Sequence, residues 1–396
     1  MGISFFTFTQ IAFLSDTYKG RCKEYNFIHY ILFVTYFPHL IAGPIIHHKD
    51  MMPQFANLLR GKFSWYNVSL GASIFVLGLF KKVVVADYFV CFVQTLFDTA
   101  SPPILFINAW FGILCYAVQL YFDFSGYSDM AIGLSTLFGI RMPINFNSPY
   151  QATSIIDFWR RWHISLSNFL REYLYIPLGG NRKGFIRKNM NLFLTMFLGG
   201  LWHGAGLTFI LWGVIHGILL MLNNFLIWIS NFIPSKLRRF FSVKETKKII
   251  TFLFVVLAWV PFRAPSLEIS MNIWKGCFGM NGFIFPKIWA EKLGSYRGTI
   301  ESMGWDIADV SPGFSLLSLC ILFLSLLIVL YGPNVMQIFY SHRHALILSE
   351  KKDIDPPESL CWQWQPNKLW AMIIAIVFIL GLWCRHATSE FLYFQF

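Results

Sequence analysis

A histidine in a glycine-rich turn is the first residue of this sequence that could do acid–base chemistry. His203 lies in the run Gly199-Gly-Leu-Trp-His-Gly-Ala-Gly206, between two apolar stretches. Neutral imidazole is the least costly ionisable side chain in an apolar interior, and it is the usual general base near neutral pH. The glycines permit a tight turn and close approach of the backbone to a substrate. The alternative is a structural histidine bonded to a carbonyl, with the glycines serving helix packing.

Two further histidines occupy helical patterns. His163 lies in the segment 157–176, whose apolar residues recur at helical spacing and predict one amphipathic helix resting at a membrane interface. His163 is the only ionisable residue on the apolar face, so it points into a protein cavity or snorkels to the interface. His216 lies between Gly213 and Gly217. This small-xxx-small pair favours a helix contact and a structural role for His216.

Other chemistry-bearing patterns are weaker. Asp123 and Asp129 lie beside an apolar stretch, where they either orient a histidine or cap the next helix, and capping is the simpler interpretation. The ten histidines, including the adjacent His47 and His48, show no metal-ligand spacing of the H-E-x-x-H kind. A serine nucleophile elbow, a P-loop and a dinucleotide fingerprint are also absent from the sequence. If the chain is an enzyme, the residues therefore predict a histidine base in the membrane without a metal or a visible cofactor.

The composition requires that membrane helices position these residues. Of the 396 residues, 56% are hydrophobic, 19% aromatic and 13% charged, whereas a soluble domain carries about 25% charged residues. The mean hydropathy is +0.54. These values exclude an ordinary cytosolic enzyme, a secreted disulfide scaffold and a disordered chain. The seven cysteines form no C-x-x-C pair and are interpreted as packing residues.

The apolar stretches predict a single all-α, polytopic membrane domain over residues 1–396. Two shorter apolar segments, 189–202 and 249–262, are spans, half-spans or steep insertions. Lys81 and Lys82 predict a break or an end in the stretch that contains them. The stretches that approach the length of a span are 27–46, 68–93, 104–122, 207–230, 314–332 and 369–385.

The net charge of +12 is interpreted through the positive-inside rule and not as nucleic-acid binding. Two basic clusters are expected to face the cytoplasm. They are Arg182, Lys183, Arg187 and Lys188, and then Lys236, Arg238, Arg239, Lys244, Lys247 and Lys248. A helix over 189–202 rises roughly 20 Å, short of a core of about 30 Å. The turn at 202–206 is therefore expected inside the membrane, against protein or a cavity.

Several longer motifs resemble those of the membrane-bound O-acyltransferase superfamily, in the same order and from residue 1 to 396. The most similar branch is the bacterial one that includes the alginate O-acetylation membrane protein and peptidoglycan O-acetyltransferases, with the teichoic-acid D-alanyl transfer protein more distant. The motifs are Pro38-His39-Leu-Ile-Ala-Gly-Pro44, Met52-Pro-Gln-Phe55, Tyr121-Phe-Asp-Phe-Ser-Gly-Tyr-Ser-Asp129, Phe158-Trp-Arg-Arg-Trp-His163-Ile-Ser-Leu-Ser, Tyr175-Ile-Pro-Leu-Gly-Gly-Asn-Arg182, Gly200-Leu-Trp-His-Gly204 and Phe391-Leu-Tyr-Phe-Gln-Phe396.

The resemblance implies about 8–10 membrane-embedded helices around a funnel or tunnel, with interfacial amphipathic helices, in the bacterial cytoplasmic (inner) membrane. It implies transfer of an acetyl group from a cytoplasmic thioester, such as acetyl-CoA, to a hydroxyl of a cell-surface polysaccharide, directly or through a periplasmic acyltransferase partner. Members of this branch usually carry further apolar helices before the segment that opens this chain, so the chain is expected to lack N-terminal helices of the family pattern.

The resemblance also implies site residues. The superfamily's signature histidine matches His203, and its second catalytic position matches His163. The resulting hypothesis makes His203 the base that takes the acceptor hydroxyl proton, while His163 orients or polarises the thioester carbonyl. The basic cluster attracts the anionic part of the donor, CoA or phosphopantetheine. Its residues are Arg182, Lys183, Arg187 and Lys188.

Three alternatives remain at the level of the sequence. Within enzymes, the group transferred could be D-alanyl or a longer acyl chain, because tunnel volume sets that choice. From another class, the chain could be a transporter or a non-catalytic membrane scaffold for an acylation complex. A transporter is expected to show inverted repeats or charges along several spans, and the sequence shows neither. Substitution of the histidines separates a scaffold from an enzyme.

Overall fold

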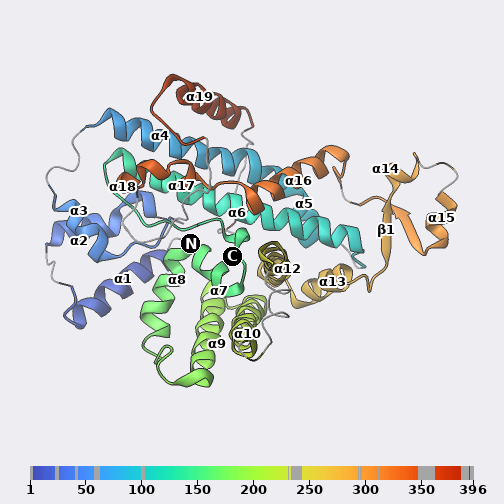
Figure 1. The fold of residues 1–396 in the computed structure, drawn as a ribbon, viewed down its shortest axis with the longest axis horizontal. Helices are drawn as coiled ribbons and strands as arrows, with labels where there is room; N and C mark the ends of the chain where they lie inside the picture. Colours follow the sequence, from blue (N-terminus) through green and yellow to red (C-terminus); the bar gives the residue numbers. More distant parts are fainter. Residues whose placement is uncertain are drawn as a thin grey trace.

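The structure is a computed structural model, and it confirms that the chain is mostly helical (Figure 1). Lys236, Arg238, Arg239 and most of the closing motif at 391–396 lie outside the described residues. The structure describes residues 3–22, 26–40, 43–57, 63–99, 103–230, 232, 243–292, 294, 297–310, 312–346, 362–384 and 392.

Helix α6 (Phe106–Leu137) is the central element, buried along most of its 32 residues. Helix α4 (Trp65–Phe80) packs against it in the opposite direction through glycine pairs. A methyl group at Gly78 would lie 2.6 Å from the carbonyl oxygen of Gly126, and one at Gly126 would lie 2.7 Å from that of Gly78. The two backbones therefore approach as closely as small-residue interfaces in membrane helices allow.

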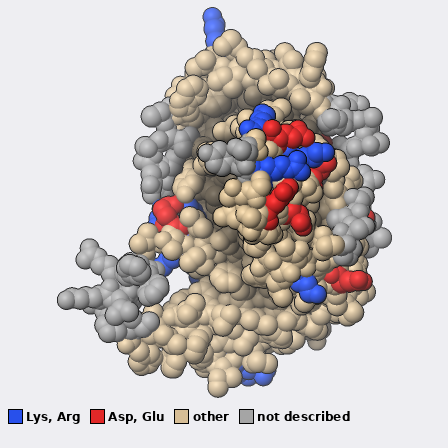
Figure 2. All heavy atoms as spheres, turned by 90° about the vertical axis from the view of Figure 1, so that its right-hand side faces the viewer, with Lys and Arg blue, Asp and Glu red and all other residues tan. Residues whose placement is uncertain are grey.

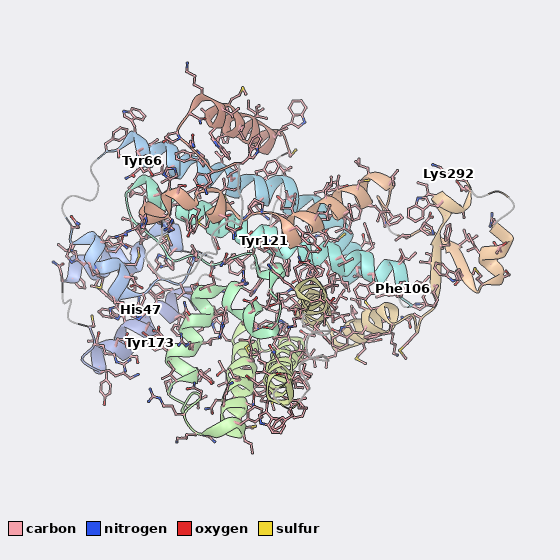
Figure 3. All side chains as sticks on the ribbon, viewed as in Figure 1. His47, Tyr66, Phe106, Tyr121, Tyr173 and Lys292 are labelled. Carbon is pink, nitrogen blue, oxygen red and sulfur yellow. The ribbon has the colours of Figure 1, made fainter. Side chains whose placement is uncertain are left out.

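The predicted break at Lys81 and Lys82 is instead a change of helix type. The chain continues from α4 as a π-helical turn, η2 (Lys81–Ala86), which rotates both lysines toward α6. Lys81 Nζ lies 2.6 Å from Asp129 Oδ2, and Lys82 Nζ lies 2.5 Å from Asp123 Oδ1. Lys81 is also 5.6 Å from the ring centroid of Tyr121, near the centre of the molecule (Figure 3).

These ion pairs correct the interpretation of the two aspartates. Asp123 and Asp129 lie in the interior of α6, so neither caps a helix. Asp123 also accepts a hydrogen bond from the backbone N–H of Leu392, at 3.1 Å, which ties the end of the chain to α6. After η2 the chain continues through η3 (Asp87–Phe89), α5 (Val90–Gln94) and η4 (Thr95–Thr99).

The N-terminal elements also differ from expectation. The stretch 27–46 does not form one span: α2 (Phe27–Thr35) has nine residues, about 14 Å of helix. Pro38 follows within the short η1 (Phe37–His39), and it cannot continue α2 because it has no backbone N–H to donate within a helix. Helix α1 (Ile3–Tyr18) precedes this pair, and α3 (His48–Phe55) follows it.

Residues 149–277 form a group of helices on one side of α6, below it in Figure 1. The single helix predicted for 157–176 is broken into α7 (Ile155–Arg161), α8 (Ile164–Leu170) and the π-helical η6 (Arg171–Tyr175). The other elements of the group are η5 (Pro149–Gln151), α9 (Gly184–His203), α10 (Leu207–Ser230), α12 (Lys244–Arg263) and α13 (Leu267–Cys277).

Helix α9 begins at Gly184, five residues before the predicted start at 189. Its 20 residues span about 30 Å, but the first turns carry Arg187 and Lys188. The apolar part from Asn189 to His203 still measures only about 22 Å. The position of the turn after His203 inside the membrane stays a prediction.

The C-terminal part adds a small parallel sheet that an all-α prediction does not contain. Strands β1 (Phe283–Pro286) and β2 (Trp305–Ala308) pair with Phe283 opposite Trp305. Seen from this end of the molecule, charged side chains gather in one area and most of the face is uncharged (Figure 2). The other elements here are α14 (Lys287–Ala290), α15 (Arg297–Ser302), α16 (Leu316–Tyr331), α17 (Val335–Ile338), η8 (Tyr340–His342), α18 (Arg343–Leu346) and α19 (Lys368–Trp383).

Helix length and composition identify candidate membrane-spanning helices among the described residues. The continuous helix Trp65–Asp98, with 34 residues, and α10, with 24, are long and apolar enough to cross a membrane. The apolar helices α16 and α19 have 16 residues each and are shorter than a usual span of about 20. The arrangement is that of a polytopic helical membrane protein.

Candidate active site

His163 occupies the break between α7 and α8 in a strained backbone conformation. Its φ of 44° and ψ of 55° are left-handed, which is uncommon for a residue other than glycine. The residue is buried, with 2% of its surface exposed. Such conformations cost about 1–3 kcal/mol and persist only where surrounding contacts enforce them.

Asn145 provides those contacts. Its backbone carbonyl accepts a hydrogen bond from the N–H of Ile164 at 3.0 Å, and its side-chain oxygen lies 3.0 Å from Nδ1 of His163. The hydroxyl of Ser165 donates to the same oxygen at 2.9 Å, while the Asn145 amide donates to Ser128 of α6 at 3.3 Å. Asn145 therefore links the break between α7 and α8 to the central helix α6.

The Asn145 contact also fixes the state of the imidazole. An amide oxygen only accepts hydrogen bonds, so Nδ1 of His163 must carry the proton. In the neutral ring, Nε2 then carries the lone pair. His163 is thereby arranged to accept a proton or a hydrogen bond at Nε2.

His203 is the last residue of α9 and lies in an aromatic surrounding. Its ring centroid is 5.1 Å from that of Trp212 and 5.1 Å from that of Phe262, both edge-on. Glycines bring α9 and α10 together here, because a methyl group at Gly213 would lie 2.5 Å from the carbonyl oxygen of Met196. The close helix contact is what holds His203 against Trp212.

His163 and His203 line one cavity. It measures about 20 Å³, room for about one water molecule. Apolar and aromatic side chains surround it, so charge that develops inside is poorly screened and fixed dipoles act strongly. The other lining residues are Leu120, Phe124, Trp159, Trp162, Leu166, Trp212, Trp259 and Phe262. A donor and an acceptor can enter only if some of these aromatic side chains move.

His216 lies behind this wall. It is fully buried, and its Nδ1 accepts a hydrogen bond from the indole N–H of Trp159 at 3.2 Å. The helix contact predicted from its flanking glycines is present, since a methyl group at Gly217 would lie 2.8 Å from the ring of Phe193. His216 thus holds Trp159, a wall residue, which agrees with the structural role.

The structure does not bring the basic cluster to the histidines. Arg182, Lys183 and Arg187 are exposed around the start of α9, and Lys188 donates to Asn224 of α10 at 2.7 Å. The helix between Lys188 and His203 measures about 22 Å. The basic cluster and His203 lie at opposite ends of α9.

Some contributors were not predicted from the sequence. Asn145 lies 18 residues before His163, and no periodic pattern connects an asparagine in a loop with a histidine at that separation. Of the tryptophans that line the cavity, Trp159 and Trp162 belong to the apolar pattern that contains His163, but no spacing relates Trp212 and Trp259 to it. Three-dimensional contact, and not spacing, identifies Asn145 and these two tryptophans.

One group of side chains among the described residues could hold a metal ion. It consists of Asp16, His47 and His48, whose ligand atoms lie within 4.8 Å of one another. These residues do not line the histidine cavity.

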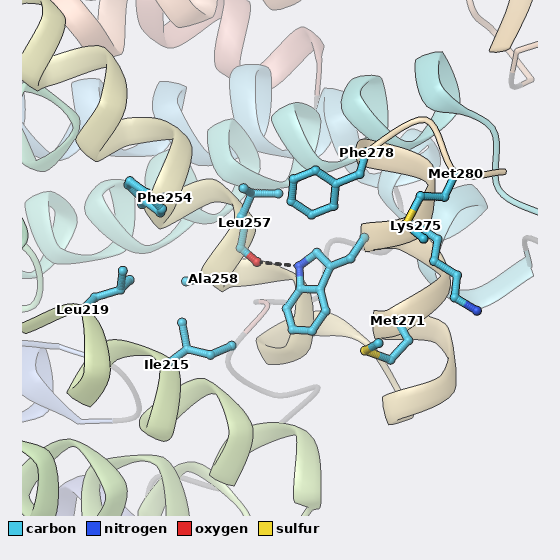
Figure 4. A pocket seen from close by; sticks show the side chains of 10 residues that line it. Ile215, Leu219, Phe254, Leu257, Ala258, Met271, Lys275, Phe278 and Met280 are labelled. Atoms are coloured by element: carbon cyan, nitrogen blue, oxygen red, sulfur yellow. Dashed lines mark hydrogen bonds between the residues drawn. The ribbon is translucent and has the colours of Figure 1, made fainter. Parts of the chain in front are cut away.

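A second cavity, of about 360 Å³, opens between α10, α12 and α13 (Figure 4). Trp274 is one of its lining residues and donates its indole N–H to the carbonyl of Leu257 at 3.0 Å, the bond dashed in Figure 4. Lys275 is the single charged side chain among the lining residues, which are otherwise apolar. The lining suits an apolar chain and, apart from Lys275, offers no ionisable group.

These features define a class: a polytopic helical membrane protein in which two histidines from different helices face one small, aromatic-walled cavity. Comparison with known families identifies it further. The chain belongs to the membrane-bound O-acyltransferase family, whose profile matches residues 3–271.

Individual relatives agree with this assignment. The chain is 48% identical over 307 residues to the peptidoglycan O-acetyltransferase of Helicobacter pylori, covering 71% of this chain and 57% of that protein. It is 46% identical over 281 residues to a probable alginate O-acetylase of Pseudomonas aeruginosa, covering 70% and 51%. A probable alginate O-acetylase of Pseudomonas putida is 38% identical over 401 residues, covering 100% and 75%. The chain thus spans little more than half the length of the first two relatives.

Proposed function

We propose that this chain carries the transfer step of a membrane O-acetyltransferase in the cytoplasmic membrane of a bacterium. The acetyl group passes from a cytoplasmic thioester such as acetyl-CoA to a hydroxyl of a cell-surface polysaccharide, directly or through a periplasmic acyltransferase partner. Family membership and the names of the relatives support this reaction class. The observation that carries the proposal is that His163 and His203 line the same cavity.

The proposed chemistry needs a base but no further reactant. His203 takes the proton of the acceptor hydroxyl while the hydroxyl oxygen bonds to the thioester carbonyl carbon. The carbon–sulfur bond then breaks, and the leaving thiolate recovers the proton from the imidazolium. A positioned general base contributes typically 10²–10⁴-fold to such a step. The low-dielectric cavity wall strengthens each of these electrostatic effects.

The hydrogen bond to Asn145 changes the role proposed for His163. A neutral His163 with its proton on Nδ1 has no N–H at Nε2 with which to polarise a carbonyl. It can instead accept a hydrogen bond from another hydroxyl of the acceptor sugar, because the single proton of the reacting hydroxyl goes to His203. We therefore place the acceptor, and not the thioester oxygen, beside Nε2 of His163.

The basic residues at the start of α9 fit a donor with a long arm. Arg182, Lys183 and Arg187 are exposed, and they would attract the phosphates of a CoA or phosphopantetheine donor together with Lys188. Their separation from His203 by most of a 20-residue helix requires that the thioester reach the cavity at the end of an extended arm.

The test is complementation of a strain that lacks the gene. O-acetyl content is measured in peptidoglycan and in surface polysaccharide after expression of the unmodified chain, with labelled acetate to identify the group transferred. The proposal predicts that labelled ester-linked acetyl returns to one of the two polymers. Restoration of alanyl or longer acyl esters without acetyl, or no change in either polymer with the chain present in the membrane, would contradict it.

A further inference from the structure

A second group of polar side chains lies apart from the histidine cavity, where three distant segments meet. Asp16 comes from the end of α1, His47 and His48 from the start of α3, and Tyr173 from η6. His47 and Tyr173 lie next to each other in Figure 3. Asp16 and His48 are buried, with 5% and 4% of their surface exposed. Burying a carboxylate beside imidazoles costs free energy unless the groups are hydrogen-bonded, paired or bound to an ion.

The distances within this group match the geometry of a metal site. Asp16 Oδ2 lies 3.2 Å from Nε2 of His47 and 3.2 Å from Nε2 of His48. Ligands at about 2.0–2.1 Å from a tetrahedral Zn²⁺ are separated by roughly 3.3–3.4 Å. The two distances from the carboxylate therefore have nearly the spacing that an ion would impose, and all the ligand atoms lie within 4.8 Å of one another.

The donor atoms also suit a cation. Imidazole nitrogens and a carboxylate oxygen are ligands that Zn²⁺ takes in proteins, and each binds the ion in its deprotonated form.

We propose that Asp16, His47 and His48 bind a Zn²⁺ ion through Oδ2 and the two Nε2 atoms, with water at the fourth position. Tyr173, whose hydroxyl donates to Asp16 Oδ2 at 2.8 Å, orients the carboxylate from outside the ligand set. Binding through Nε2 replaces the 2.7 Å hydrogen bond between His47 Nε2 and the Tyr173 hydroxyl. It also puts the His47 proton on Nδ1, which costs the weak 3.3 Å contact that Nδ1 accepts from the N–H of Lys49.

The ion would join the N-terminal helices to the candidate active site. Two residues before His47, the backbone N–H of Ile45 donates to the hydroxyl of Ser165 at 2.9 Å. Ser165 in turn donates to the Asn145 oxygen that holds His163. A metal at His47 and His48 therefore fixes the segment that supports this network. The role is structural, since the proposed ligands do not line the histidine cavity.

The sequence analysis predicted no metal site because the ligands do not form a local motif. His48 follows Asp16 by 32 residues, and the adjacent histidines alone are not diagnostic. The alternative to an ion is a metal-free hydrogen-bonded cluster in which Asp16 accepts from Tyr173 and from both imidazoles. Metal content distinguishes the two directly.

The experiment uses the full chain, purified in detergent, stripped with a chelator and titrated with Zn²⁺. Bound zinc is measured by elemental analysis after desalting, and the midpoint of thermal unfolding is followed in parallel. The matched control is His344→Ala, which removes an exposed histidine of α18. We expect about one Zn²⁺ per chain and a higher Tm with zinc in both the unmodified chain and this control.

The substitutions Asp16→Asn and His48→Ala are expected to abolish stoichiometric binding and the zinc-dependent rise in Tm. Tyr173→Phe is expected to keep the stoichiometry and weaken the affinity about 10–100-fold. An unmodified chain that binds no zinc at saturation overturns the proposal without reference to any variant. Equal zinc binding by the unmodified chain and by Asp16→Asn, which keeps the shape of the side chain, overturns it as well.

Discussion

At the scale of single residues, the site depends on one loop asparagine. Asn145 contacts the backbone after His163, the imidazole of His163 and the hydroxyl of Ser165. It therefore determines both the shape of the break between α7 and α8 and the tautomer of the histidine. A double variant of Asn145 and His163 distinguishes a role of Asn145 that acts through His163 from a general loss of stability.

We predict that Asn145→Leu lowers acetyl transfer nearly as far as His163→Ala does, because the imidazole loses the group that fixes its tautomer and orientation. The double variant should fall no further than either single one, since residues that act as a unit are strongly non-additive. Acetyl content at matched protein level is the measurement. If the losses of activity in the two single variants multiply in the double variant, Asn145 acts independently of His163.

The backbone of His163 supports a second prediction. Glycine reaches the left-handed region at no steric cost, whereas alanine there costs about 1–2 kcal/mol. Both His163→Gly and His163→Ala should lose the transfer activity, but His163→Gly should have the higher Tm in detergent. A lower Tm for the glycine variant would mean that the break does not require a positive φ.

At the scale of elements, buried ion pairs hold η2 against α6. The side chains of Lys81 and Asp129 are 13% and 11% exposed, and they come from the long apolar helix Trp65–Asp98 and from the buried helix α6. Breaking a buried pair by removing one partner costs about 3–5 kcal/mol, while replacing both with apolar residues is often nearly neutral.

Accordingly, Lys81→Met should reduce the yield and Tm of the folded chain, because it leaves a buried carboxylate without its cation. The double variant Lys81→Met/Asp129→Leu should recover most of that loss. Thermal unfolding of the two detergent-purified variants provides the comparison. If the double variant is as unstable as the single one, the pair has a role beyond charge compensation.

The elements also show where sequence reasoning ends. Lys81 and Lys82 were expected to stop a helix because charges are costly in an apolar run, but their partners on α6 make continuation possible. The helical periodicity over 157–176 is present in the sequence. The helix is nevertheless broken at His163, because the backbone carbonyl of Asn145 accepts a hydrogen bond from the N–H of Ile164. The stretch 27–46 contains Pro38, which has no backbone N–H for a continuing helix, and the span prediction did not take this into account.

At the scale of the whole molecule, the composition and the ordered motifs were sufficient to predict the fold class and the family. The meeting of His163 and His203 in one cavity could not follow from spacing, because it depends on how α9 packs on α10 and how both face α6. The contact between Leu392 and Asp123 likewise joins the far end of the chain to the central helix. Local patterns carry no information about such distant contacts.

The most direct measurement compares His203→Ala with His344→Ala in the gene-deletion strain, at equal amounts of membrane-inserted protein. His344 is exposed on α18, so its substitution controls for the loss of a histidine alone. Loss of the base should lower polymer acetylation by His203→Ala at least about 100-fold, while His344→Ala restores it fully. If His203→Ala restores acetylation to within a factor of two of the control, His203 is not the base, and the chain acts as a scaffold.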